Sequence, residues 1–302
     1  MKLLQYRRFV FPLFVFPLRA LGMCAYRLPV RWRTRLGKGI GEIFRIVSPS
    51  RRRIAKENLQ AAFPDAEAAW RLNIERLSYH NLGITLIELL TFPYITPAEA
   101  RAALDLRGTE NIEQALKSGT GVLLLSGHFG NWELLGFTFP LYLDVATSII
   151  VAQQSNRIAD TYLNWYRRRT GNTTLPTNNS ARAIVKRLLS GEAIALLADQ
   201  VADVDHCVFV PFFGRLTATY QAPARLALRY NVPIFVAFAE RLDDGRYRAA
   251  VQQIPHEDLN YSPEGITELT ARHVQALEDA IRQHPELWAW QHKRWKHKLP
   301  EE

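Results

Sequence analysis

Short apolar, β-rich segments alternate with helical patterns from about residue 103 onward, and this alternation constrains the fold most strongly. Strands are predicted at the segments GVLLLS, ATSIIVA, AIALLAD, PIFVAFA and YRAAVQ. Several of these segments are almost wholly apolar, as expected for strands of a parallel sheet that is covered on both faces. We therefore predict an α/β fold in which a mixed, largely parallel sheet is flanked by helices.

Helical patterns separate the predicted strands and fill the part of the chain before them. Between and after the strands, helices are predicted over Ile112–Lys117, Asn131–Phe139, Ile158–Arg169, Ala181–Leu189, Pro223–Tyr230 and Gly265–Gln283. Earlier in the chain, Ser48 and Pro49 predict a helix start, and a long helical pattern runs from about Glu67 to Leu90. We predict one domain over residues 31–302, helical over 31–100 and with its α/β core at 101–302.

The charge balance narrows the partners that the chain can have. Of the 302 residues, 48% are apolar, which provides for a sizeable core, and 38 Lys and Arg outnumber 29 Asp and Glu. The excess of +9 favours anionic lipid, phosphorylated substrates, nucleic acid or an acidic carrier protein. No nucleic-acid recognition module is recognisable, and the basic residues gather with apolar ones, so we expect no nucleic-acid partner.

Cysteine and histidine spacing predicts neither a metal site nor a disulfide framework. The two cysteines, Cys24 and Cys207, are far apart and form no CxxC pair. The histidines near the end of the chain lack a metal-binding spacing with cysteine or carboxylate partners. We expect no metal and no cofactor.

The first 30 residues are predicted to associate with a membrane. An apolar run over Phe9–Leu18 is interrupted by Arg19 and continues over Ala20–Tyr26, with further arginines on both sides. A membrane span needs roughly 20 mostly apolar residues, and here Arg19 and two prolines weaken it. An interfacial segment, with Phe and Leu in the acyl region and arginines at the headgroups, is the alternative. An ordinary buried helix is disfavoured by the density of basic residues.

The segment GVLLLSGHFGNWELLG carries the candidate chemistry, because it places His128 and Glu133 in apolar surroundings. A buried charge is costly unless it is paired. His128 follows a predicted buried strand, where open α/β sheets bind ligands. Asn131 is a suitable cap for a helix that begins near Trp132. The turn between His128 and Glu133 would let the carboxylate fold back onto the imidazole.

A histidine held by a carboxylate on one ring nitrogen can act as a general base through the other nitrogen. The hydroxyl that it activates can belong to an acceptor substrate, so no serine or cysteine nucleophile is needed. The alternative is a structural histidine paired with a glutamate in the core, because two residue types at one spacing are common by chance.

Five motifs in order resemble one known family. GHFGNWE is similar to the H-x4-D/E motif of the late acyltransferases of lipid A biosynthesis, which belong to the wider group of glycerolipid acyltransferases. RRRIAKENLQAAFPD, LLADQ, VFVPFFGR and LWAWQHKRWK resemble further blocks of the same family. The resemblance extends from about Arg51 to Lys296.

The resemblance implies a membrane-bound transferase of fatty acyl groups. Its donor would be an acyl carrier protein thioester, or acyl-coenzyme A, and its acceptor a hydroxyl of a lipid A precursor. His128 would be the base and Glu133 its orienting partner, on the cytoplasmic face of the inner membrane. Another glycolipid or a lysophospholipid is the alternative acceptor, and a non-catalytic lipid-binding protein is a competing function.

Six further residues are predicted to bind substrate. They are Asn131, Asn156, Arg167, Arg169, Asp199 and Gln200. Arg157 and the arginines at 167–169 could bind acceptor phosphates or carrier carboxylates, or form a solvated helix face. Asp199 ends an apolar strand and could orient the acceptor or cap a turn. The family's Arg-Pro-x-x-Asn-Pro stretch reads AQQSNRIAD here, without its first Arg and its prolines. This difference concerns the identity of the acceptor lipid and not the fold or the reaction.

Overall fold

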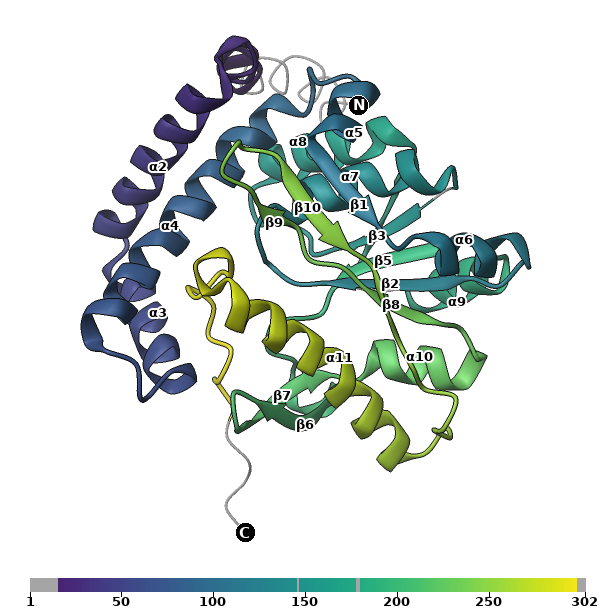
Figure 1. Cartoon of the computed structure of the whole chain (residues 1–302). Helices are drawn as coiled ribbons and strands as arrows, with labels where there is room; N and C mark the ends of the chain where they lie inside the picture. The colour runs from purple at the N-terminus through teal and green to yellow at the C-terminus, as the bar shows by residue number, and fades with distance from the viewer. Residues whose placement is uncertain (1–15, 146, 178–179, 298–302) are drawn as a thin grey trace, which may run out of the picture.

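A six-stranded sheet forms the centre of the molecule in the computed structural model, which describes residues 16–145, 147–177 and 180–297 (Figure 1). The strand order is β11-β8-β2-β5-β3-β4. The strands are β2 (Val122–Ser126), β3 (Thr147–Val151), β4 (Thr173–Pro176), β5 (Ala193–Leu197), β8 (Ile234–Val236) and β11 (Gln252–Ile254). Only β11 runs antiparallel to its neighbour within this sheet. The predicted mixed, largely parallel α/β sheet is confirmed.

Helices cover both faces of this sheet. One face packs against α6 (Glu110–Lys117), α7 (Trp132–Leu143) and α8 (Arg157–Arg167), and the other against α9 (Ala181–Leu189), α10 (Ala222–Tyr230) and α11 (Pro263–Gln283). Successive strand residues point to opposite faces, so Leu124 joins the core beneath α7 while Leu123 and Leu125 join the core beneath α9–α11. These six helices lie where the sequence predicts them, within a few residues at each end.

Smaller β elements complete the α/β part. β1 (Leu104–Arg107), β10 (Tyr247–Ala250) and β9 (Glu240–Arg241) form a three-stranded sheet, and β6 (Cys207–Phe212) pairs with β7 (Arg215–Tyr220). Short 3-10 turns are η1 (Arg168–Thr170), η2 (Val204–His206) and η3 (Pro285–Leu287). The sequence analysis does not predict β1, β4, β7, β9 or β11, because strands of two to six partly polar residues carry little periodicity.

Besides the helical residues 16–27, four helices of the described chain precede β1, and the first three of them form one side of the molecule (Figure 1). They are α2 (Val30–Val47), α3 (Pro49–Ala62), α4 (Ala68–Thr91) and α5 (Pro97–Ala103). α2 and α4 cross with their backbones in contact, because each contributes glycine. A Cβ built on Gly83 would lie 2.1 Å from the carbonyl oxygen of Gly37 and 2.8 Å from the Cα of Gly41. Glycine at these positions permits the close approach.

The side of α2 opposite to its glycines is apolar and exposed. Trp32, Leu36, Ile43, Ile46 and Val47 share this face at helical spacing and are 46–66% exposed. We call these five residues the α2 apolar stripe. Of the segment predicted to associate with a membrane, residues 1–15 lie outside the described part, and residues 16–27 are helical. No helix among the described residues is long and apolar enough to cross a bilayer.

A third core joins the N-terminal helices to the end of the chain. Leu59 of α3 and Ile74 of α4 pack in one cluster with Phe212, Trp288 and Trp290. The two tryptophans are 1% and 0% exposed. Tryptophan combined with positive charge, as near the C-terminus, is typical of a membrane interface. Trp288 and Trp290 are instead buried in the protein.

Candidate active site

His128 lies in the turn between β2 and α7. β2 ends at Ser126 and α7 begins at Trp132, with Asn131 as its N-cap: the Asn131 side chain accepts a hydrogen bond of 2.9 Å from the Leu134 N–H. His128 is therefore at the carboxyl end of a parallel strand, as the sequence predicts. Its side chain is 23% exposed, so the ring is held by protein contacts but reachable from solvent.

Asp199 is the carboxylate that contacts the His128 ring. The Nδ1 of His128 and the Oδ1 of Asp199 are 2.8 Å apart. The sheet explains this meeting: β2 and β5 are parallel neighbours in which Ser126 pairs with Leu197, so the residues two positions further lie side by side. Gly127 permits the close approach, because a Cβ there would lie 3.3 Å from the Cβ of Asp199.

The second oxygen of Asp199 accepts hydrogen bonds from two further N–H groups. The backbone N–H of His128 donates at 2.7 Å and the indole N–H of Trp288 at 2.9 Å. Burial raises the pKa of Asp199, but the charge of His128 and these hydrogen bonds outweigh burial and lower the pKa to about 2. Asp199 is therefore an anion at neutral pH although its side chain is only 3% exposed.

The remaining nitrogen of His128 faces Gln200. The amide Nε2 of Gln200 lies 3.3 Å from the Nε2 of His128. With Nδ1 donating its proton to Asp199, Nε2 carries the lone pair and accepts from the amide. Burial lowers the pKa of His128, but the charge of Asp199 and its hydrogen bond outweigh burial, so the pKa is raised. The imidazole has the arrangement of a general base.

Among the described residues, the ring of His128 is hydrogen-bonded to Asp199 and Gln200 and not to Glu133, so the direct contact predicted for Glu133 is not formed, although the Glu133 charge helps to raise the pKa of His128. Its carboxylate accepts hydrogen bonds of 2.5 Å from the Tyr166 hydroxyl and of 2.5 and 3.0 Å from the Arg167 guanidinium. Burial raises the pKa of Glu133, but Arg167 and Tyr166 outweigh it and lower the pKa. The first turn of α7 directs this side chain toward α8, so Glu133 and Arg167 form an ion pair between the two helices, with side chains 12% and 14% exposed.

The other predicted substrate-binding residues fall into two groups. Asp199 and Gln200 reach His128, as described above. Asn131, by contrast, is fully buried: besides capping α7, its side chain donates a hydrogen bond to Glu88 at 2.7 Å, so its described contacts are with the protein. Arg169 donates to the carbonyl of Phe92 at 2.9 Å, and Asn156 accepts from the Ala159 N–H at 3.1 Å at the start of α8.

A pocket of about 450 Å³ opens onto the His128 ring. On one side it is lined by His128, Trp132, Asp199 and Gln200, and on the other by the N-terminal helices and the C-terminal segment through Phe44, Ser48, Arg51, Tyr79, Leu82, Ala289, Gln291 and His292. Its size is that of a pocket for a small molecule or part of a larger substrate, with apolar walls and a few polar groups. The sequence analysis did not single out Phe44, Tyr79 or Arg51, because nothing in the sequence indicates that α2–α4 face the end of the sheet.

Buried charges fix the N-terminal wall of this pocket. Glu75 of α4 is 0% exposed and bonds to Arg45 of α2 at 3.1 Å and to Arg52 of α3 at 3.4 Å. One carboxylate therefore ties three helices together. Burial, followed by the nearby charge of Glu75, raises the pKa of the pocket residue Tyr79 to about 12, so this side chain remains a neutral phenol.

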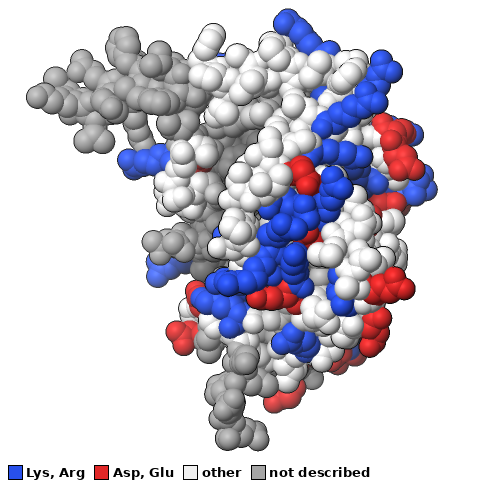
Figure 2. Space-filling model, turned by 90° about the vertical axis from the view of Figure 1, so that its left-hand side faces the viewer, with Lys and Arg blue, Asp and Glu red and all other residues white. Residues whose placement is uncertain are grey.

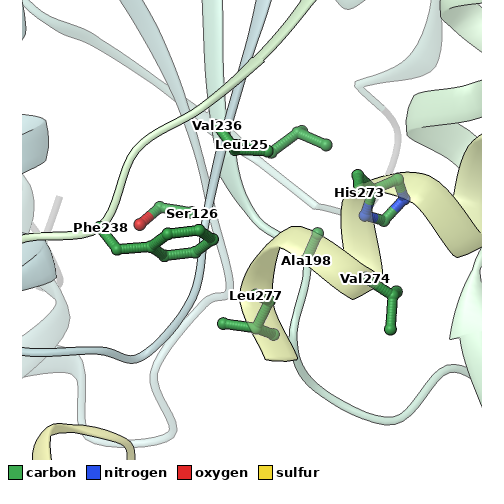
Figure 3. Close-up of a pocket in the computed structure, with 8 residues that line it drawn as sticks. All are labelled: Leu125, Ser126, Ala198, Val236, Phe238, His273, Val274 and Leu277. Atoms are coloured by element: carbon green, nitrogen blue, oxygen red, sulfur yellow. The ribbon is translucent and has the colours of Figure 1, made fainter. Parts of the chain in front are cut away.

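Another histidine lies behind the sheet edge and has a different character. His273 of α11 borders a cavity of about 10 Å³ together with Ser126, Ala198, Phe238 and Leu277 (Figure 3). This volume is about the least that holds one water. Burial and the charge of Arg294 lower the pKa of His273 to about 4, so the ring is neutral at physiological pH and is separated from the larger pocket.

No group of three or more His, Cys, Asp or Glu side chains within residues 16–145, 147–177 and 180–297 is arranged to hold a metal ion. The geometry at the end of β2 is that of a carboxylate-held imidazole lining a pocket. It can take a proton from a hydroxyl that enters the pocket.

Comparison with known proteins identifies the family. Residues 2–297 match the model of the bacterial lipid A biosynthesis acyltransferase family. The chain belongs to this family. It is therefore an acyltransferase, as the sequence motifs predict.

Individual relatives are distant but cover most of the chain. The chain is 24% identical to the lipid A biosynthesis palmitoleoyltransferase of Escherichia coli K12, over 86% of its own length and 84% of that protein. It is 22% identical to a lipid A biosynthesis acyltransferase of Haemophilus influenzae, over 91% of this chain and 84% of the relative. It is also 23% identical to the phosphatidylinositol mannoside acyltransferase of Mycolicibacterium smegmatis, over 69% of this chain and 67% of that protein.

Proposed function

We propose that the enzyme transfers a fatty acyl group from a thioester donor to a hydroxyl of a glycolipid, with a lipid A precursor as the first candidate acceptor. The observation that carries this proposal is the His128–Asp199 pair at the floor of the pocket of about 450 Å³. A general base beside an open pocket suits activation of a hydroxyl supplied by the substrate.

In the proposed reaction the acceptor hydroxyl displaces the Gln200 amide from the Nε2 of His128. As the hydroxyl loses its proton to Nε2, its oxygen forms a bond to the thioester carbonyl carbon. The carbon–sulfur bond of the tetrahedral intermediate then breaks, and the proton passes from the imidazolium to the departing thiolate. Asp199 stabilises the imidazolium that forms and holds the ring in one tautomer.

Two kinds of glycolipid acceptor are supported by the relatives. Their names include lipid A acyltransferases and phosphatidylinositol mannoside acyltransferases, so a hydroxyl of a glycolipid is the chemistry they share. The AQQSNRIAD segment departs from the pattern of lipid A members, which keeps a different glycolipid or a lysophospholipid as the alternative acceptor.

An acyl carrier protein is proposed as the donor, with acyl-coenzyme A as the alternative. The side of the molecule that carries α2 is crossed by a band of Lys and Arg side chains (Figure 2). Exposed basic residues of α2 and α3 on this side are Arg31, Arg35, Lys38, Arg51, Arg53 and Lys56. Arg51 also lines the pocket, so an acidic carrier or an anionic headgroup would be attracted toward its mouth.

The α2 apolar stripe is proposed as a membrane contact, on the cytoplasmic face of the inner membrane. Its neighbour Phe44 is 38% exposed and also lines the pocket, so the stripe leads to the pocket mouth. The guanidinium of Arg35 lies over the Trp32 ring at 4.9 Å, which places a basic group beside the apolar surface. Apolar residues flanked by arginine are typical of interfacial helices.

Replacing Leu36, Ile43 and Ile46 together with serine is expected to weaken binding to anionic vesicles. Burying one such side chain contributes about 1.5–3 kcal/mol, so partial burial of three corresponds to roughly a hundredfold weaker partition. Vesicle flotation measures the effect, with melting temperature as the check on folding. A control variant with Leu189 and Leu216 changed to serine removes exposed leucines outside α2. Unchanged flotation of the triple variant would assign the membrane contact to another segment, and deletion of residues 1–30 would then test the N-terminus.

Mass spectrometry of lipids from a strain that lacks the gene tests the proposed reaction directly. One glycolipid species should lose a single fatty acyl group, and wild-type protein but not His128→Ala should restore it. The purified enzyme should use acyl carrier protein faster than acyl-coenzyme A, with a rate that falls as salt rises. An unchanged lipid profile, with no transfer from either donor, would contradict the proposed reaction.

A further inference from the structure

We propose that Trp288 is a positioning residue for the reaction: its indole N–H holds Asp199 in the orientation and the charge state in which the carboxylate serves His128. The inference rests on the proposed function only where it treats His128 as the base. Trp288 itself contacts no reacting atom, because Asp199 lies between the indole and the imidazole.

The contact has the geometry of a fixed support. The Oδ2 of Asp199 accepts a hydrogen bond of 2.9 Å from the Trp288 indole N–H and one of 2.7 Å from the His128 backbone N–H. The Oδ1 of Asp199 lies 2.8 Å from the Nδ1 of His128. Asp199 is 3% and Trp288 1% exposed. Water therefore has little access to replace the indole N–H. Without this donor, the buried carboxylate of Asp199 would lose one of the hydrogen bonds that stabilise its charge.

The indole is itself held on several sides. Its ring packs edge-on against Trp290 and Phe212, with centroids 4.7 and 5.6 Å away. Its backbone forms an antiparallel bridge with Phe129, and the N–H of the following Ala289 donates to the carbonyl of His128 at 3.0 Å. The segment that carries the indole is thus bonded to the same turn that carries the base.

The indole N–H also affects how readily His128 takes up a proton. A donor to Asp199 stabilises the anion most while the imidazole is neutral, because the imidazolium, once formed, already neutralises the carboxylate. Trp288 therefore lowers the pKa of His128, and its removal should raise that pKa. The other titratable and charged groups that face the pair are Glu133 of α7 and His292 and Arg294 of the C-terminal segment. None of them changes in the variants below.

Trp290 provides a matched control within the same aromatic cluster. It is 0% exposed, and its indole N–H donates to the carbonyl of Pro285 at 2.7 Å instead of to Asp199. Trp288→Phe and Trp290→Phe therefore each remove one buried indole N–H, and each exchanges an indole for a smaller ring. A purely structural role for Trp288 predicts similar consequences of the two changes.

The test compares the two variants in turnover and in the titration of His128. Trp288→Phe is expected to lower kcat by about tenfold or more, by analogy with outer-shell partners of metal-bound histidines. It should also raise the pKa of the His128 imidazole, followed by NMR without substrate, by roughly half a unit or more. Trp290→Phe should leave both near wild type. The NMR readout separates this inference from the proposed function, since it needs no acyl transfer.

Two further variants keep the inference testable. In an Asp199→Asn background, Trp288→Phe should cause no additional loss of kcat, because the indole acts through Asp199. If Trp288→Phe does not fold, benzothienylalanine at position 288 removes the N–H while preserving the ring. An unshifted His128 titration, or an equal loss of kcat with and without Asp199, would overturn the positioning role.

Discussion

Replacing His128 with alanine should lower kcat by about 10²–10⁴-fold or more, because the group that accepts the hydroxyl proton is lost. Folding should be preserved, since the ring is partly exposed and lies at the floor of an open pocket. Acyl transfer to a purified glycolipid measures the loss. His284→Ala is the control, because His284 is a partly exposed histidine that is not among the residues lining the pocket. Transfer at the wild-type rate by His128→Ala would show that another group is the base.

The same imidazole sets the expected pH dependence of the wild-type enzyme. His128 must be neutral to accept a proton, and Asp199 raises its pKa above the ordinary value of 6.5. Turnover should therefore be full well above this raised pKa and should fall as the pH drops through it. A pH profile of kcat measures the acid limb, which His128→Ala should lack.

Asp199→Asn should lower kcat by as much as about 10⁴-fold, because an amide can hold the imidazole in the wrong tautomer and cannot stabilise its charged form. Glu133→Gln is the matched comparison: it too replaces a buried carboxylate with an amide of the same shape. It leaves Arg167 without its carboxylate partner, so the expected loss is in stability, about 3–5 kcal/mol as for other broken buried pairs. Turnover per folded molecule should change far less.

Kinetics and chemical denaturation together measure the two variants. The reverse result, with Asp199→Asn active and Glu133→Gln folded but inactive, would restore Glu133 as the carboxylate that serves His128. Both variants retaining full turnover would mean that the imidazole needs no anion beside it.

The sequence predicts the sheet and the position of His128 at the end of a strand because both depend on local patterns. Apolar runs such as GVLLLS are long enough to be recognised as buried strands, and Asn131 predicts the start of α7 correctly. The sequence predicts residues 31–100 as helical but gives α2 no bounds of its own, because the exposed face of α2 is as apolar as many buried faces and its packing face consists of glycine.

The partner of His128 could not be chosen from sequence spacing alone. Glu133 is five residues away and Asp199 is 71 residues away, yet the register of β2 and β5 brings the distant carboxylate to the ring. Local spacing does not show where a side chain in the first turn of a helix points. The sequence analysis placed His128 after one apolar strand and Asp199 at the end of another, which was the usable signal, because the carboxyl ends of parallel strands meet at one edge of the sheet.

The glycine crossing between α2 and α4 makes the width of the pocket depend on residues that contact no substrate. Gly37, Gly41 and Gly83 allow the two backbones to touch, and the pocket-lining Phe44 lies one turn beyond Gly41 on α2. A methyl group at position 83 would force the helices apart and carry that wall outward. Selectivity for acceptors of different bulk can therefore be retuned by changing helix spacing while every side chain that touches the ligand stays the same.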